Sequence, residues 1–219
     1  MPLPPPPAAS GTYRRFVASL SIDYEKWREG TGYDLEALAA LPAHEQRRAE
    51  RLLIERGLRN WRDVDALAQL ALASASPRAL AALRDALQHG PVPVRMRVVR
   101  RCPQLADAAT RTASLLRALR EGEPMQGLSE ALDEAVAWHP TPVIHALWQA
   151  LRERDARVAP TVAALLLHLH GLARQRLALE HRPFVLRFAT DDPAACAAAI
   201  AALRARIGDP DFSSNPQAT

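Results

Sequence analysis

Cysteine and aromatic residues are scarce in this chain, and both shortages exclude classes of protein. Its 219 residues include 2 cysteines, and phenylalanine, tryptophan and tyrosine together make up 5%. A small disulfide-stabilised scaffold would carry more cysteines, and Cys102 and Cys196 lie far apart, so we expect two buried thiols in a reducing compartment. Leucine and alanine carry most of the apolar content, and both are strong helix formers.

Long apolar runs are also absent, and neither sign of charge dominates. The most apolar stretch, residues 162–169, is too short to cross a bilayer, and the N-terminal residues lack the basic and apolar regions of a signal peptide. The 28 basic and 24 acidic residues leave a net charge of +4 and are interleaved in sequence. A nucleic-acid binder usually concentrates its basic residues on one face. The sequence therefore predicts a cytoplasmic protein without a membrane partner, and it disfavours nucleic acid as a partner.

The motifs of common metal sites and nucleophiles are missing as well. The chain has no Cys-x-x-Cys pair, no His-Glu-x-x-His helix and no Gly-x-Ser-x-Gly elbow. His168 and His170 are two residues apart, so on a helix they point about 200° away from each other and cannot share a metal. We therefore expect no metal, no cofactor and no catalytic residue. A histidine of this pair, and His139 before Pro140, are expected to cap the last carbonyl groups of helices.

Proline and glycine divide the rest of the chain into segments with helical spacing of apolar residues. Prolines mark the expected helix starts, at 42, 77, 142 and 193. Glycines mark the expected ends, at 57, 90, 122, 171 and 208. These signals predict helical hairpins over 42–73, 76–101, 109–138 and 142–170, and a final helix over 193–207.

The predicted fold is an all-α, right-handed α-solenoid of about four hairpins, because each hairpin alone is too small to hide its apolar face. Residues 1–20 begin with a proline run that cannot form a helix, so they are expected to be a disordered tail. Residues 209–219 are polar and form a second expected disordered tail. Residues 21–208 are expected to form a single domain between them.

The segment from Ser76 to Arg101 resembles a HEAT-type repeat of the short bacterial kind. Its first helix is rich in alanine and leucine, and Val94-Arg95 opens the second. The whole chain, with its Asp-Tyr-Glu-Lys-Trp at 23–27 and Arg-Pro-Phe at 182–184, resembles a group of bacterial HEAT-repeat proteins. Some small HEAT-like proteins are adaptors or immunity partners of toxins. The resemblance therefore implies a non-enzymatic protein-binding function through the concave face of a solenoid.

The most aromatic part of the ordered chain is residues 23–34, which contain Tyr24, Trp27 and Tyr33. Tyrosine and tryptophan at a protein edge are common contact residues, because they bury a large area at low cost in entropy. A solenoid must also cover its first repeat, and the same three side chains could pack over it. The sequence leaves both interpretations open, a contact surface for a partner and a cap.

One basic cluster has no acidic residue within its helix. Arg95, Arg97, Arg100 and Arg101 lie close together, and the last three share a helical face. This face is a candidate docking site for a protein with an acidic patch, and such binding should weaken with salt. The alternative is that Arg95 pairs with an acid such as Asp85 or Asp133 and that the others are solvated.

An enzymatic alternative rests on Asp63. Some HEAT-like proteins are DNA glycosylases that use an aspartate and tryptophans, and Asp63 with Trp61 and Trp148 could imitate that set. The interleaved charges argue against the continuous phosphate-binding surface that such an enzyme needs. Asp63 and Asp65 could instead stabilise a helix N-terminus. A purely structural scaffold is a further alternative.

Residues 184–188 read Phe-Val-Leu-Arg-Phe and follow Pro183. The segment is expected to be an apolar plug or a short helix. Phe184 and Phe188 are four residues apart, so on a helix they share one face. They would form a lid over the last hairpin or an exposed anchor for a partner.

Overall fold

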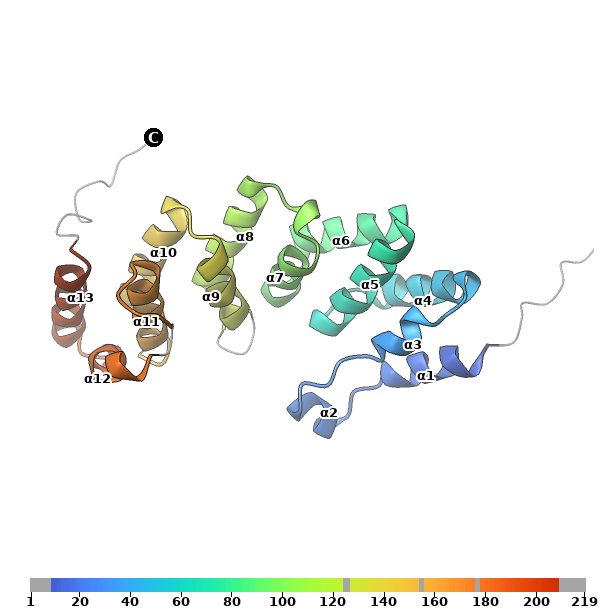
Figure 1. Cartoon of the computed structure of the whole chain (residues 1–219), viewed down its shortest axis with the longest axis horizontal. Helices are drawn as coiled ribbons and strands as arrows, with labels where there is room; N and C mark the ends of the chain where they lie inside the picture. Colours follow the sequence, from blue (N-terminus) through green and yellow to red (C-terminus); the bar gives the residue numbers. More distant parts are fainter. Residues whose placement is uncertain (1–8, 124–126, 154–155, 176–177, 209–219) are drawn as a thin grey trace, which may run out of the picture. The chain divides into compact units, whose positions relative to one another are not determined.

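The structure is a computed structural model, and it describes residues 9–123, 127–153, 156–175 and 178–208 (Figure 1). In these ranges all regular secondary structure is helical, apart from an isolated bridge between Glu123 and Gly127. The predicted all-α class is confirmed. The helical stretches also fall where proline and glycine predicted them, so each expected hairpin appears as a pair of helices.

The chain divides into two compact units, Met1–Ala108 and Ala109–Thr219. A single domain over 21–208 stays a prediction. The apolar helical spacing continues on both sides of residue 108, so the sequence carries no mark of this boundary.

The first unit is built around α5, which is buried on almost every side. Its side chains from Val64 to Ala68 and at Leu70 and Ala71 are buried, and α5 packs against α3, α4, α6 and α7. Burial over consecutive helical turns places α5 in the centre of the core, and Figure 1 shows α5 between its neighbours. The helices of this unit are α1 (Gly11–Ser19), α2 (Tyr24–Arg28), α3 (Leu35–Ala39), α4 (Ala43–Arg56), α5 (Trp61–Ser74), α6 (Pro77–His89), α7 (Val92–Arg101) and the short η1 (Pro103–Leu105).

Helix α1 corrects the prediction of a disordered tail over residues 1–20. Ser10 caps this helix, accepting a hydrogen bond from the Tyr13 amide at 3.0 Å, and Tyr13 and Phe16 are buried in the core. The Ser10 amide and hydroxyl donate to Glu45 at 2.7 and 2.6 Å, which joins α1 to α4 and holds the pKa of that carboxyl below its usual range. The sequence prediction failed because the neighbouring proline run outweighed the short amphipathic pattern formed by Tyr13 and Phe16. Residues 1–8 and 209–219, the remaining predicted tails, lie outside the described residues.

The second unit is centred on α11, whose side chains from Val162 to Leu167 are buried. Helix α11 packs against α9, α10, α12, α13 and η3. The helices of this unit are α8 (Ala108–Glu121, which begins at the boundary), α9 (Leu128–Ala137), α10 (Thr141–Glu153), α11 (Ala159–Leu169), η2 (Leu179–His181), α12 (Arg182–Val185), η3 (Leu186–Phe188) and α13 (Pro193–Ile207).

The segment after Pro183 is helical, as one of the two interpretations predicted. Phe184 and Phe188 are 6% and 0% exposed, and their rings meet edge to face with centroids 6.0 Å apart. They therefore serve as a lid packed on α11, and the alternative of an exposed anchor at these two residues is wrong.

Local signals placed the ends of α13 correctly. Asp192 accepts a hydrogen bond from the Ala194 amide at 3.0 Å, Pro193 occupies the first helical position, and Gly208 ends the helix at a φ of 78°. The helix spans Pro193–Ile207, which confirms the prediction of 193–207.

Candidate protein-binding surface

Helix α2 exposes the two largest apolar side chains of its segment. Tyr24 is 70% exposed and Trp27 is 60% exposed, and their rings stack with centroids 6.0 Å apart and planes at 27°. Asp23 begins the helix by accepting a hydrogen bond from the Lys26 amide at 2.9 Å. A tryptophan buries a large area when a partner covers it, so a stacked and exposed pair is a strong candidate contact.

The loop that follows α2 is fixed to the start of α5. The Arg62 side chain, which is 7% exposed, donates from Nε to the Thr31 carbonyl at 2.7 Å. The Tyr33 hydroxyl donates to the Asp63 carboxylate at 2.8 Å. The exposed aromatic pair therefore lies on a short helix whose following loop is held by two hydrogen bonds, and presenting the pair to a partner requires little ordering.

A hollow of about 580 Å³ lies beside the aromatic pair. It combines apolar walls with cationic side chains, a combination that suits an apolar side chain next to an acidic one. We call Tyr24, Trp27 and this hollow the α2 surface. The hollow is lined by Leu20, Ile22, Asp23, Tyr24, Trp27, Tyr33, Arg56, Asn60 and Arg62.

Tyr33 was predicted to bind a partner, and the structure places it inside the unit instead. It is 7% exposed, and burial together with the hydrogen bond to Asp63 raises its pKa to about 12. The cap interpretation therefore describes Tyr33, whereas Tyr24 and Trp27 lie at the surface. The hydrogen bond that holds Tyr33 inside the unit comes from its contact with Asp63, which is 30 residues away in sequence.

Replacing Tyr33 with phenylalanine should reduce the alkaline sensitivity of the protein. The folded-state pKa of about 12 is higher than the ordinary 10.0, so the folded state favours the protonated phenol. Its stabilisation is complete below pH 10 and is lost as pH rises to about 12. Urea unfolding at several pH values should show that wild type loses about 2–3 kcal/mol more than Tyr33→Phe over this window. Parallel losses in the two proteins would contradict this assignment.

Part of the arginine face of α7 is paired with an acid from another helix. Arg97 donates to Asp65 from Nε at 2.7 Å and from a second guanidinium nitrogen, and the Arg101 Nε lies 3.2 Å from the same carboxylate. Asp65 itself is 7% exposed. Arg97 and Arg101 therefore share one carboxylate, which offsets one of their two positive charges. The docking role of Arg97, Arg100 and Arg101 stays a prediction. Arg100 is exposed.

The sequence did not predict Asp65 as the partner of Arg97 and Arg101. Asp85, one of the partners considered for Arg95, accepts a hydrogen bond from Nδ1 of the His89 ring at 2.9 Å. Asp65 comes from α5, 32 residues before Arg97, and no spacing rule within α7 could reveal it.

Both carboxylate oxygens of Asp63 accept hydrogen bonds from other groups of the first unit. It accepts from the Tyr33 hydroxyl on one oxygen and from the amides of Arg59 and Asn60, at 3.0 and 3.1 Å, on the other. Together with Asn60 it forms a capping box at the start of α5. It is 3% exposed. These contacts favour the helix N-terminus interpretation over the catalytic one.

Trp61, the neighbour of Asp63 in the enzymatic alternative, is also occupied. The guanidinium groups of Arg62 and Arg97 lie over its ring, 4.6 and 5.3 Å from the centroid. A tryptophan covered in this way is not available to stack on a base. Trp148 belongs to the second unit, where it is buried on α10.

The histidines and cysteines have structural contacts. His139 Nδ1 lies 3.2 Å from the Ala135 carbonyl at the end of α9, as predicted, whereas His168 Nδ1 bonds the Ala173 carbonyl beyond the end of α11, at 3.0 Å. Cys102 is buried, which raises the pKa of its thiol, and Cys196 is half-buried. Among the described residues, no three histidine, cysteine, aspartate or glutamate side chains are grouped so as to hold a metal.

Comparisons with family models, with curated proteins and with solved structures find no match for this chain. None of the helices in the described ranges combines the length and apolar character needed to span a membrane.

Proposed function

We propose that this protein is a non-enzymatic protein-binding module that holds its partner through the α2 surface. The observation that carries the proposal is the stacked pair of Tyr24 and Trp27, 70% and 60% exposed on α2, whose following loop is anchored by Arg62 and Asp63. Exposed aromatic side chains on a rigid base are the usual centres of binding energy in protein interfaces.

The hollow beside this pair supports a partner with an apolar side chain next to an acidic one. A leucine-sized or aromatic side chain would enter the hollow against Ile22, and an adjacent acid would approach Arg56. This retains the preference for an acidic partner but moves it from the arginine face of α7 to the α2 surface. The salt dependence of binding should be small, because few charges contribute.

The resemblance to bacterial HEAT-repeat proteins supports a more specific proposal. The hairpins would belong to a HEAT-like right-handed solenoid, and the protein would act in the cytoplasm as an adaptor or as the immunity partner of a toxin or effector. The regular pairing of helices supports this proposal.

Trp27→Ala should abolish most of the affinity for the partner. Loss of an exposed aromatic contact residue typically costs about 2 kcal/mol or more, which is about thirtyfold in Kd. The partner would be captured from the native host with the wild-type chain and identified, and its affinity then measured by titration against each variant. Tyr24→Ala should show a similar loss.

Leu72→Ala is the matched control, because Leu72 is a large apolar side chain that is 59% exposed on α5, outside the α2 surface. It should bind like wild type, and all three variants should unfold within about 0.5 kcal/mol of wild type. Equal affinity of wild type and Trp27→Ala would refute the proposal. So would release of a base from alkylated duplex DNA that Asp63→Asn abolishes.

A further inference from the structure

The α2 surface combines aromatic faces with hydrogen-bond donors. Tyr24 and Trp27 expose their rings, and their side chains end in a phenol O–H and an indole N–H. Arg56, which is exposed, lines the same hollow and carries further N–H donors. The surface therefore suits a ligand that offers apolar rings together with hydrogen-bond acceptors.

The acceptor side chains that line the hollow are already engaged. Asp23 accepts a hydrogen bond from the Lys26 amide at 2.9 Å, and its second oxygen lies 3.8 Å from Lys26 Nζ. The side-chain oxygen of Asn60 accepts from the Arg62 amide at 2.9 Å. An ordinary extended peptide would bring backbone N–H groups to this hollow, and an N–H left without a partner is costly. A ligand that lacks backbone N–H groups avoids this cost.

Proline-rich segments are ligands of this kind. A proline has a backbone carbonyl but no N–H, so a run of prolines presents acceptors alone. Such a run favours the polyproline II helix before it binds, so it loses little entropy on binding. Proteins recognise these segments with surfaces lined by exposed aromatic side chains, as Tyr24 and Trp27 are here.

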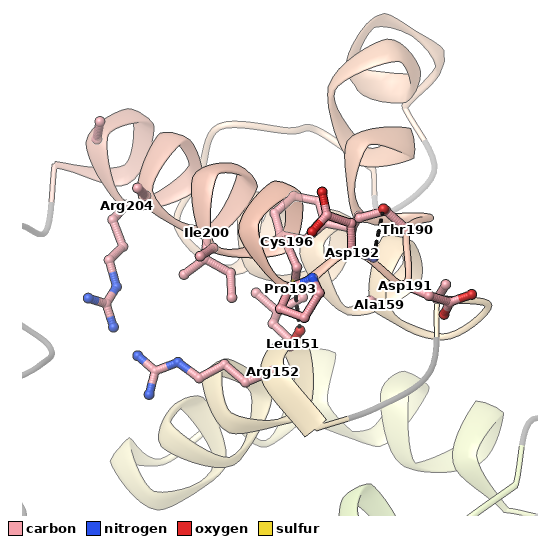
Figure 2. Close-up of a pocket in the computed structure, with 15 residues that line it drawn as sticks. Leu151, Arg152, Ala159, Thr190, Asp191, Asp192, Pro193, Cys196, Ile200 and Arg204 are labelled. Carbon is pink, nitrogen blue, oxygen red and sulfur yellow. Dashed lines mark hydrogen bonds between the residues drawn. The ribbon is translucent and has the colours of Figure 1, made fainter.

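A pocket of the second unit does not share this chemistry. Figure 2 shows this pocket, of about 750 Å³, between α10 and α13. No tyrosine or tryptophan lines it, and Asp191 and Asp192 lie among its lining residues. Of these two hollows, the α2 surface is therefore the one suited to a proline-rich segment.

The chain itself contains a segment of the required chemistry. Residues 1–8 read Met-Pro-Leu-Pro-Pro-Pro-Pro-Ala, and no two prolines are adjacent elsewhere in the 219 residues. The run at 4–7 supplies the proline rings. Leu3 supplies the leucine-sized side chain that suits the hollow beside Ile22.

The proline run is too close to α1 to cover the α2 surface of its own molecule. Ala9 is held at the start of α1, where its carbonyl accepts from Arg14 at 3.0 Å. Pro4 precedes Ala9 by five residues, which span about 16 Å in polyproline II geometry. The nine residues of α1 alone span about 14 Å, and α2 lies beyond the far end of that helix (Figure 1). The four prolines together can therefore reach this surface only on another molecule.

We propose that the α2 surface binds residues 1–8 of a second copy of this chain, and that two copies exchange these segments to form a dimer. The inference rests on the proposed function, because both use the α2 surface. In the exchange each copy supplies one segment and one surface, which closes the dimer without a new element of structure. Self-association and binding of another partner would then compete.

Sedimentation equilibrium of the full chain tests the dimer. The wild-type mass should rise from the monomer value of 24.0 kDa to twice that value between about 1 µM and 1 mM. Trp27→Ala removes the surface, and a serine variant removes the segment through Pro4→Ser, Pro5→Ser, Pro6→Ser and Pro7→Ser. Each should weaken self-association at least about tenfold.

Two control variants change the same residue types elsewhere. Combined Pro210→Ser and Pro216→Ser removes prolines from the opposite end of the sequence, and Leu72→Ala removes an exposed apolar side chain of α5. Both should associate like wild type. Thermal unfolding checks that every variant is folded, and Tyr24→Ala is a second surface variant if Trp27→Ala is not.

Mixing the two defective variants distinguishes exchange from other modes of association. Trp27→Ala retains the segment and the serine variant retains the surface, so one contact can form between them. The mixture should associate more strongly than either variant alone. Association that is lost in Trp27→Ala but persists in the serine variant would mean that two aromatic pairs meet face to face, and it would overturn the proposal.

A synthetic peptide of residues 1–8 tests the contact directly. Added to the full-length serine variant, it should shift the indole N–H resonance of Trp27 in a saturable way, and Trp27→Phe assigns that resonance. The peptide with its four consecutive prolines replaced by serine should bind at least about tenfold more weakly. Equal binding of the two peptides, or no shift with either, would refute the proposal.

The outcomes separate this inference from the proposed function. A wild-type chain that stays monomeric to 1 mM overturns the dimer, including the case in which the serine substitutions move the Trp27 resonance within a monomer. The proposed function would stand in either case if Trp27→Ala still loses affinity for a partner captured from the host. Loss of self-association in Trp27→Ala without loss of affinity for that partner would refute the proposed function and leave the dimer.

Discussion

Replacing Phe16 with alanine is expected to lower the free energy of unfolding by about 3–5 kcal/mol. Phe16 is 0% exposed and packs in the core of the first unit from α1. Its removal forfeits the transfer free energy of the ring and leaves a cavity that the fixed helices around it cannot fill. Urea unfolding followed by far-ultraviolet circular dichroism would measure the change.

Val17→Ala is the control for this prediction. Val17 follows Phe16 on the same helix but is 36% exposed, so its truncation should cost within about 0.5 kcal/mol. The comparison separates loss of the buried side chain from any effect on the helix itself. Equal, small effects of the two substitutions would mean that α1 does not belong to the core and that the segment behaves as the tail expected from its proline-rich beginning.

Asp65→Ala should destabilise the first unit by roughly 3 kcal/mol. Asp65 accepts hydrogen bonds from Arg97, whose side chain is 25% exposed, and lies close to Arg101. Removing one partner of a buried ion pair leaves the other charge poorly solvated, which typically costs about 3–5 kcal/mol; the lower end applies because Arg101 is 43% exposed. The same urea titration would measure it.

Asp85→Ala provides the matched comparison, since Asp85 pairs with His89 in a contact whose side chains are 74% and 72% exposed. An exposed pair contributes less than about 1 kcal/mol, so this substitution should be nearly neutral. A loss at Asp65 no larger than the loss at Asp85 would show that the ion pairs of Asp65 with Arg97 and Arg101 contribute no more than an exposed pair.

Helix positions were predictable because their signals are local. The oxygen of Asp192, the ring of Pro193 and the backbone freedom of Gly208 act on groups within a few residues, so α13 could be located from the sequence. The predicted hairpins begin at residue 42, so α1, α2 and α3 were all missed. In α1, Tyr13 and Phe16 lie on one face, but the neighbouring prolines dominated the pattern.

The candidate site was predictable only in part. Tyr24, Trp27 and Tyr33 were recognised as one aromatic segment, but nothing in their spacing separates the two exposed side chains from the buried one. Tyr33 is set apart by Asp63, which accepts a hydrogen bond from the Tyr33 hydroxyl.

By itself, the sequence determined that this protein is all-helical and where most of its helices begin and end, since proline, glycine and capping side chains act over a few residues. The tertiary structure alone decided which side chains remain at the surface and which charges are paired. Burial and ion pairing join residues such as Asp65 and Arg97, which are 32 positions apart. Such contacts depend on the packing of whole helices, which no local pattern of residues encodes.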